Sequence, residues 1–97
     1  MYKLLKIMKS DKPNKKMKAI FLNNNTRKQK IVYFGASGYS DYTIHKDNKR
    51  KQAYIARHQV NEDFNNPISA GSLSRYILWN KPTIKASIED YKKRFNL

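Results

Sequence analysis

Residues 16–22 run Lys16-Met17-Lys18-Ala19-Ile20-Phe21-Leu22, and this alternation decides the fold of the first third of the chain. A period of two is typical of a strand, because successive side chains of an extended chain point to opposite faces. It puts Met17, Ala19 and Phe21 on one face and Lys16 and Lys18 on the other. The stretch therefore predicts a strand with one apolar face and one basic face.

Turn signals flank this strand on both sides. They are Asp11-Lys12-Pro13-Asn14 before it and Asn23-Asn24-Asn25 after it, since asparagine tolerates left-handed backbone and bonds locally. Beyond the turns lie residues 2–9, which mix apolar side chains with lysines, and the β-branched and aromatic residues 30–34. Turns this short join only antiparallel strands, so we predict a three-stranded antiparallel meander. The spacing in residues 2–9 also fits a short amphipathic helix, and that alternative stays open.

The second half of the chain carries helix signals. After a connector at residues 35–46, which holds two of the three glycines, Asp47 is a candidate N-cap for a helix over about residues 48–59. Ser69 or Ser72 is a candidate cap for a second helix that ends near residue 80. This second helix is apolar nearly all round, so we expect it to be the central and most buried one.

A third helix follows the junction at residues 81–83, with Thr83 as its N-cap. Its core stripe has apolar residues at i, i+4, i+7 and i+11, namely Ile84, Ile88, Tyr91 and Phe95. Asp90 and Arg94 would form a favourable i,i+4 pair on its outer face. Strands followed by helices predict an α+β fold, in which about three helices pack on one face of the small sheet. We expect a single domain over residues 1–97, with basic strands at 1–34 and a helical part at 47–97.

Positive charge dominates the composition. The chain has 21 Lys and Arg against 7 Asp and Glu among 97 residues, a formal net charge of +14. Residues 1–30 hold ten of these bases and a single acid, so this third has a net charge of +9. Self-repulsion of this size disfavours the compact state, which points to a polyanionic or acidic partner. Ten bases are predicted to meet it: Lys16, Lys18, Arg27, Lys28, Lys30, Lys46, Lys49, Arg50, Lys51 and Arg57.

Lysine outnumbers arginine in the basic strands, which bears on the kind of recognition. Lysine acts as a point charge without the planar fork that reads bases, so charge neutralisation is favoured over sequence-specific recognition. Four aromatic residues lie near these basic residues in the sequence: Tyr33, Phe34, Tyr39 and Tyr42. They could stack on the nucleobases of single-stranded DNA or RNA, although ordinary strand and core roles fit them better. Trp79 is predicted to lie in the core with its indole N–H bonded to a backbone carbonyl.

No residue pattern identifies an enzyme. Five residues suggest a metal or nuclease site, but they lack a standard ligand spacing and neighbouring bases would repel a cation: His45, Asp47, His58, Glu62 and Asp63. Ser37, Ser40 and Ser74 lack the surroundings of a nucleophile, such as the Gly-x-Ser-x-Gly elbow. The chain has no cysteine, which excludes disulfides and thiolate metal sites. We therefore expect a non-enzymatic protein without cofactor or metal.

Targeting signals are also missing from the sequence. No apolar run approaches the roughly 18 residues of a membrane span, and the lysine-rich start does not resemble a signal peptide. The expectation is a soluble, unsecreted protein that does not bind a membrane.

Two groups of residues, one before and one after the middle of the chain, resemble a known family. They are Gly38-Tyr39-Ser40-Asp41-Tyr42-Thr43-Ile44-His45-Lys46-Asp47 and Ile77-Leu78-Trp79-Asn80-Lys81-Pro82-Thr83. Over roughly residues 35–95 the chain is similar to a small uncharacterised family of nucleocytoplasmic large DNA viruses of algae and amoebae. The resemblance implies a viral protein made in the host cytoplasm, and it implies no activity. Small basic proteins of such viruses are often virion components, which is an argument by analogy.

The charge and the resemblance together favour a basic structural protein of the virus particle, a minor capsid or cement component. Its partners would be acidic surfaces of capsid proteins or the packaged genome, and the sequence leaves its oligomeric state open. The alternative is a sequence-independent DNA- or RNA-binding protein. A more remote alternative is a small nuclease that uses His45 and His58.

Overall fold

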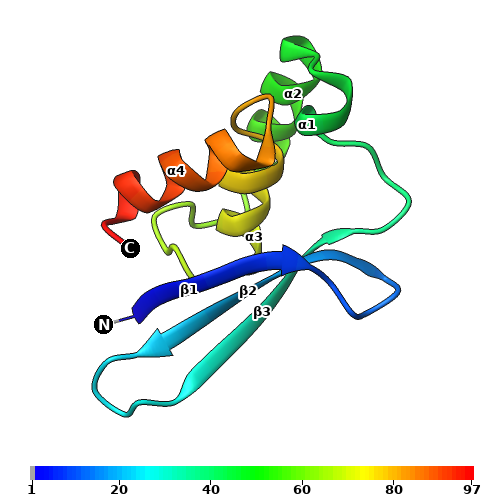
Figure 1. The fold of residues 1–97 in the computed structure, drawn as a ribbon. Helices are drawn as coiled ribbons and strands as arrows, with labels where there is room; N and C mark the ends of the chain where they lie inside the picture. The colour runs from blue at the N-terminus through cyan, green and yellow to red at the C-terminus, as the bar shows by residue number, and fades with distance from the viewer. Residues whose placement is uncertain (1) are drawn as a thin grey trace.

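The computed structural model describes residues 2–97 and has two layers, a three-stranded sheet and a helical layer over one of its faces (Figure 1). The strands are β1 (Tyr2–Lys9), β2 (Lys15–Asn23) and β3 (Gln29–Ala36), paired antiparallel in the order β1-β2-β3. The predicted meander and the α+β class are confirmed. Residues 2–9 form a strand, so the helical alternative for them is wrong.

A β-bulge explains why the sequence of β1 looked ambiguous. The register slips between Leu4 and Lys6, so that Leu4 lies opposite Phe21 and Ile7 lies opposite Ala19, with Leu5 as the extra residue. Both Leu4 and Ile7 therefore face the helices although they are three residues apart, a spacing that a regular strand does not allow. The same spacing would put two residues on one face of a helix.

Five helical segments follow the sheet. They are α1 (Tyr42–His45), α2 (Asn48–His58), α3 (Ala70–Leu73), the π-helical turn η1 (Ser74–Leu78) and α4 (Ile84–Phe95). The predicted caps Asp47 and Thr83 each accept a hydrogen bond from a backbone N–H in the first turn of their helix. Of the two candidates for the second helix, Ser69 is the cap and accepts the N–H of the other candidate, Ser72. Within residues 2–97, no helix combines the length and the apolarity that crossing a bilayer requires.

The segment between sheet and helices is more ordered than a plain connector. Strand β3 continues to Ala36 through Gly35, which has a φ of 78°, and α1 forms a single turn inside the segment expected to link the two halves. Asp41 begins this turn, because its carboxylate accepts the N–H of Thr43 at 2.9 Å.

The hydrophobic core lies between the sheet and the segment from α3 to η1, with one residue of α4 completing it. Its buried members are Leu4, Ala19, Phe21, Phe34, Leu73, Ile77, Leu78 and Tyr91. Residues 70–78 contribute three of these eight side chains, so the second predicted helix is the central one, as expected. Full burial contributes about 1.5–3 kcal/mol for each of Leu73, Ile77 and Leu78.

The outer face of the sheet departs from its prediction. Because Ala19 and Phe21 point to the helices, their neighbours Lys18, Ile20 and Leu22 point away from them. Ile20 lies opposite Ile31 in the ladder. The outer face therefore mixes lysines with apolar residues, where the sequence predicted a face rich in lysine.

Candidate functional site

The predicted polyanion-binding residues do not form one surface. Arg27 and Lys28 lie in the β2–β3 turn and Lys30 lies at the start of β3, whereas Lys46, Lys49 and Arg50 lie around the start of α2. Figure 1 places the β2–β3 turn and α2 at opposite ends of the molecule. The structure thus presents two separate basic ends instead of a continuous track.

Two of the predicted lysines are already paired with acids of the chain. Lys16 Nζ lies 2.6 Å from Asp41 Oδ2, and Lys18 Nζ lies 3.3 Å from Asp11 Oδ1. Asp41 is buried, so the first pair ties β2 to α1 inside the fold. We therefore assign Lys16 a structural role.

Lys51 also turns inward. Its Nζ donates to the carbonyl of Asn80 at 2.8 Å and lies 4.8 Å from the centre of the Tyr42 ring. Burial lowers the pKa of Lys51, and the charges of Arg75 and Lys81 lower it further. This side chain links α2 to the junction before α4, so it is less free to meet a partner than its neighbours.

The outer face of the sheet is a candidate interface of mixed character. Its lysines are Lys3, Lys6 and Lys18, and exposed apolar side chains stand among them: Leu5 is 44% exposed and Ile31 47%. None of the residues in the three strands is acidic, but Asp11 in the β1–β2 turn pairs with Lys18 at the edge of this face. The helices cover the opposite face, so this face meets solvent (Figure 1).

The aromatic residues near the bases are mostly engaged within the chain. Tyr33 donates its hydroxyl to Asp11 at 2.9 Å, which raises the pKa of Tyr33, and Lys12 Nζ lies 4.2 Å from the centre of its ring. Phe34 belongs to the core, and Tyr39 is 73% exposed. Core and strand roles thus describe Phe34 and Tyr33 better than base stacking does.

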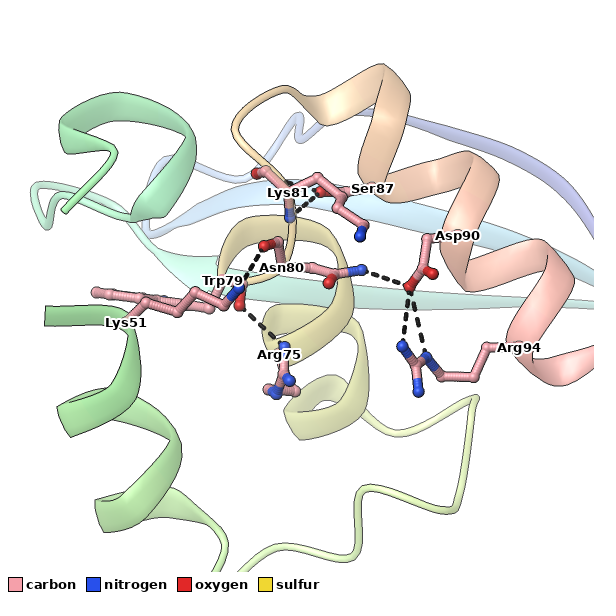
Figure 2. Close-up of polar contacts among 8 residues, drawn as sticks. All are labelled: Lys51, Arg75, Trp79, Asn80, Lys81, Ser87, Asp90 and Arg94. Atoms are coloured by element: carbon pink, nitrogen blue, oxygen red, sulfur yellow. Dashed lines mark hydrogen bonds and ion pairs between the residues drawn. The ribbon is translucent and has the colours of Figure 1, made fainter. Parts of the chain in front are cut away.

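A network of hydrogen bonds and ion pairs surrounds the junction between η1 and α4 (Figure 2). Buried Asn80 donates from Nδ2 to Asp90 Oδ2 at 2.7 Å, and Arg94 Nη2 lies 3.3 Å from the same oxygen. The hydrogen bond from Asn80 is the main reason why the pKa of Asp90 is lowered. Asp90 and Arg94 do form the predicted pair, but Asp90 also faces the junction.

Arg75, which sequence reasoning missed, completes this region together with Arg94. Arg75 Nη1 donates to the carbonyl of Trp79 at 2.9 Å, and its guanidinium carbon lies 4.9 Å from the centre of the Tyr76 ring. The guanidinium carbon of Arg94 lies 4.8 Å from the same ring. Two arginines 19 positions apart thus meet at one aromatic side chain, and no local sequence pattern signals this contact.

A cleft of about 600 Å³ separates α2 from the end of β3 and from α3. One wall is a stack of rings, in which Tyr54 lies 4.3 Å from Trp79 and 4.1 Å from His58 between ring centres. Trp79 is half-buried and its indole N–H has no hydrogen-bond partner in the described chain, so the predicted bond to a carbonyl is wrong. Stacking holds this side chain instead.

The histidines take structural positions. His58 stacks on Tyr54, and His45 Nδ1 accepts the N–H of Asp47 at 2.9 Å while its ring lies 5.3 Å from Trp79. Helix α2 ends at His58, so Glu62 does not share its helix face. Across residues 2–97, no three acidic or histidine side chains gather as metal ligands would.

The three serines considered as nucleophiles are dispersed. Ser37 and Ser40 are exposed in the loop after β3, and Ser74 lines the cleft. In the described part of the chain, none of them is hydrogen-bonded to a histidine, which a Ser–His nucleophile requires.

Comparison with known proteins assigns this chain to a family. Residues 5–58, from β1 to the last turn of α2, match a family of unknown function (DUF5754). The chain belongs to this family. It is also 35% identical over 81 residues to "Uncharacterized protein L851" of Acanthamoeba polyphaga mimivirus, with 77% of this chain and 80% of that protein covered. This relative agrees with the resemblance to uncharacterised giant-virus proteins. No solved structure matches the chain.

Proposed function

We propose that this member of the DUF5754 family is a non-enzymatic basic protein of the virus particle, a minor capsid or cement component. It would dock on the acidic surface of a capsid protein through the outer face of its sheet. The observation behind the proposal is that this uncovered face combines lysines with exposed apolar side chains and has no acid in its strands. A surface of this kind complements an acidic protein surface in both charge and apolar area.

The apolar residues favour a protein partner over nucleic acid. A phosphate backbone attracts Lys3 and Lys6 but offers little apolar surface to Leu5 and Ile31. A capsid protein offers both. The second basic end of the molecule holds Lys49 and Arg50 in the first turn of α2. With the sheet docked on one protein, this end could bind a second acidic surface, as expected of a component that fits between larger proteins.

The acidic residues of the chain neutralise only a small part of its positive charge. Asp11, Asp41 and Asp90 are already in ion pairs with bases of the fold. Since only 7 acids oppose 21 bases, most lysines and arginines remain available to a partner. Docking on an acidic surface would relieve the repulsion between them.

The second candidate is a sequence-independent nucleic-acid-binding protein. It is supported by two exposed bases, Arg27 and Lys28, in the β2–β3 turn, which lies at one end of the molecule (Figure 1). Binding of this kind would weaken steeply with salt, because each neutralised phosphate releases counterions.

Purified particles offer the test that separates the two. If the proposal holds, the protein stays at fixed stoichiometry with shells emptied of DNA. Added recombinant protein should also bind such shells, and the variant Lys3→Gln/Lys6→Gln/Ile31→Ser should bind them about tenfold or more weakly. The control variant Lys85→Gln/Lys92→Gln changes two exposed lysines of α4 and should bind normally. Loss of the protein together with the genome would support the nucleic-acid candidate instead.

A further inference from the structure

We propose that the junction between η1 and α4 is a binding site for a doubly charged oxyanion, a phosphate or phosphate monoester. The site comprises Arg75 and Arg94 beside the Tyr76 ring, with Lys51 and Lys81 nearby. It lies in the helical layer, away from the sheet face proposed for capsid docking, and it does not depend on that proposal.

The first argument is the balance of charge. Figure 2 draws four basic side chains around this junction, those of Lys51, Arg75, Lys81 and Arg94, together with the acid Asp90. One oxygen of Asp90 already accepts from Asn80 and Arg94. These five charged side chains leave an excess of three positive charges. Lys51 and Arg75 are half-buried, so repulsion between them is screened less than it would be in open solvent.

The second argument is the supply of hydrogen-bond donors. A guanidinium has five N–H donors, and Arg75 uses one of them on the carbonyl of Trp79. Arg94 uses Nε and Nη2 on Asp90, which leaves Nη1 free. Figure 2 shows the two guanidinium groups at this junction, one on a side chain from η1 and the other on a side chain from α4. Arginine forks match the tetrahedral oxygens of a phosphate.

The third argument is that the site is held in place before a ligand arrives. Tyr76 packs edge-to-face on Phe95 at 5.3 Å, and both guanidinium groups lie over the Tyr76 ring. Lys51 Nζ is fixed by its bond to the Asn80 carbonyl. Donors that are already ordered lose less conformational entropy on binding than free surface lysines do.

Titration of ¹⁵N-labelled protein with inorganic phosphate, at constant ionic strength, tests the site. The Nε–Hε resonances of Arg75 and Arg94 should shift together in a saturable way. Arg94→Gln should weaken binding about tenfold or more, because it removes a charged donor. The matched control is Arg50→Gln, an exposed arginine of α2 that lowers the net charge equally and should leave the affinity unchanged.

Arg75→Gln should abolish the phosphate response, and Arg75→Lys should restore part of it. If Arg75→Gln disturbs the fold through its bond to Trp79, Arg94→Gln still decides the outcome, because Arg94 is exposed. Equal weakening by Arg50→Gln and Arg94→Gln would mean general charge screening and would overturn the site. So would resonances of Arg75 and Arg94 that stay unmoved.

Discussion

Lys16 and Asp41 form an ion pair between positions 25 residues apart, with Nζ 2.6 Å from Oδ2. Asp41 is 2% exposed and also caps α1 by accepting the N–H of Thr43. One carboxylate thus fastens the sheet to the start of the helical layer. A lysine that the sequence suggested as a ligand for polyanions is instead used to hold the fold together.

Replacing Asp41 by alanine should lower the free energy of unfolding by about 2–4 kcal/mol, because a helix cap and the partner of a half-buried lysine are lost together. The matched control is Asp47→Ala, which removes the exposed cap of α2 and should cost about 1 kcal/mol. Urea denaturation of both variants measures the difference. Equal losses would mean that the ion pair adds nothing to capping.

Substitutions at Gly35 and Gly38 would separate the cost of backbone strain from the cost of a steric clash. Both have positive φ, of 78° and 87°, but a Cβ on Gly35 would lie 2.6 Å from Leu78 Cδ1, whereas one on Gly38 meets open space. Gly38→Ala should cost about 1–2 kcal/mol from backbone strain, and Gly35→Ala about 1–3 kcal/mol more. Thermal and urea unfolding would measure both, and similar costs would contradict the close contact with Leu78.

Tyr91 should make stability depend on alkaline pH. Its buried hydroxyl donates to the Pro67 carbonyl, and burial raises the pKa of Tyr91 well above the ordinary 10.0. The folded state keeps a proton that the unfolded state releases, so this contribution is complete below about pH 10 and is lost as the pH rises further. Tyr91→Phe should cost about 1 kcal/mol at neutral pH and flatten the decline above about pH 10. If stability fell with pH in the same way in Tyr91→Phe, other groups would be responsible for the loss.

Asn80 and Asp90 should be energetically coupled. A double-mutant cycle with Asn80→Ala and Asp90→Ala should give a coupling of about 1 kcal/mol near neutral pH, since the bond is charge-assisted. The pKa of Asp90 is lowered in the fold, so this stability is present above its ordinary value of 3.8 and is lost as the pH falls below it. A control cycle with Glu89→Ala, at the exposed neighbouring position, should show no coupling.

Local sequence signals predicted much of this structure. The alternation in residues 16–22 predicts β2, and the two turns predict its antiparallel partners. The caps Asp47 and Thr83 lie where the sequence predicted them, and Ser69 is one of its two candidates, because a cap needs only its own side chain and the next three backbone N–H groups. These features depend on residues that are adjacent in the chain, so they can be predicted from the sequence alone.

Contacts between distant segments were not predicted. The bulge at Leu5 depends on pairing with β2, and the stack of Trp79 on Tyr54 depends on how α2 packs. The meeting of Arg75 and Arg94 at one ring depends on the angle at which α4 returns over η1. In each case the sequence supplies suitable residues but does not fix their separation in space.

The sequence by itself determined β2 and its two flanking turns, the three main helical regions, two of the caps and the large excess of positive charge, because these follow from composition and from neighbours within one turn or strand. Only the tertiary structure decided what each base does. It pairs Lys16 with the buried Asp41 and places the Lys51 ammonium against the carbonyl of Asn80. It also places the β2–β3 turn, with Arg27, and helix α2, with Arg50, at opposite ends of the molecule. The physical reason is that charge is additive along a chain, whereas the electrostatic role of each charge depends on distances and burial that folding creates.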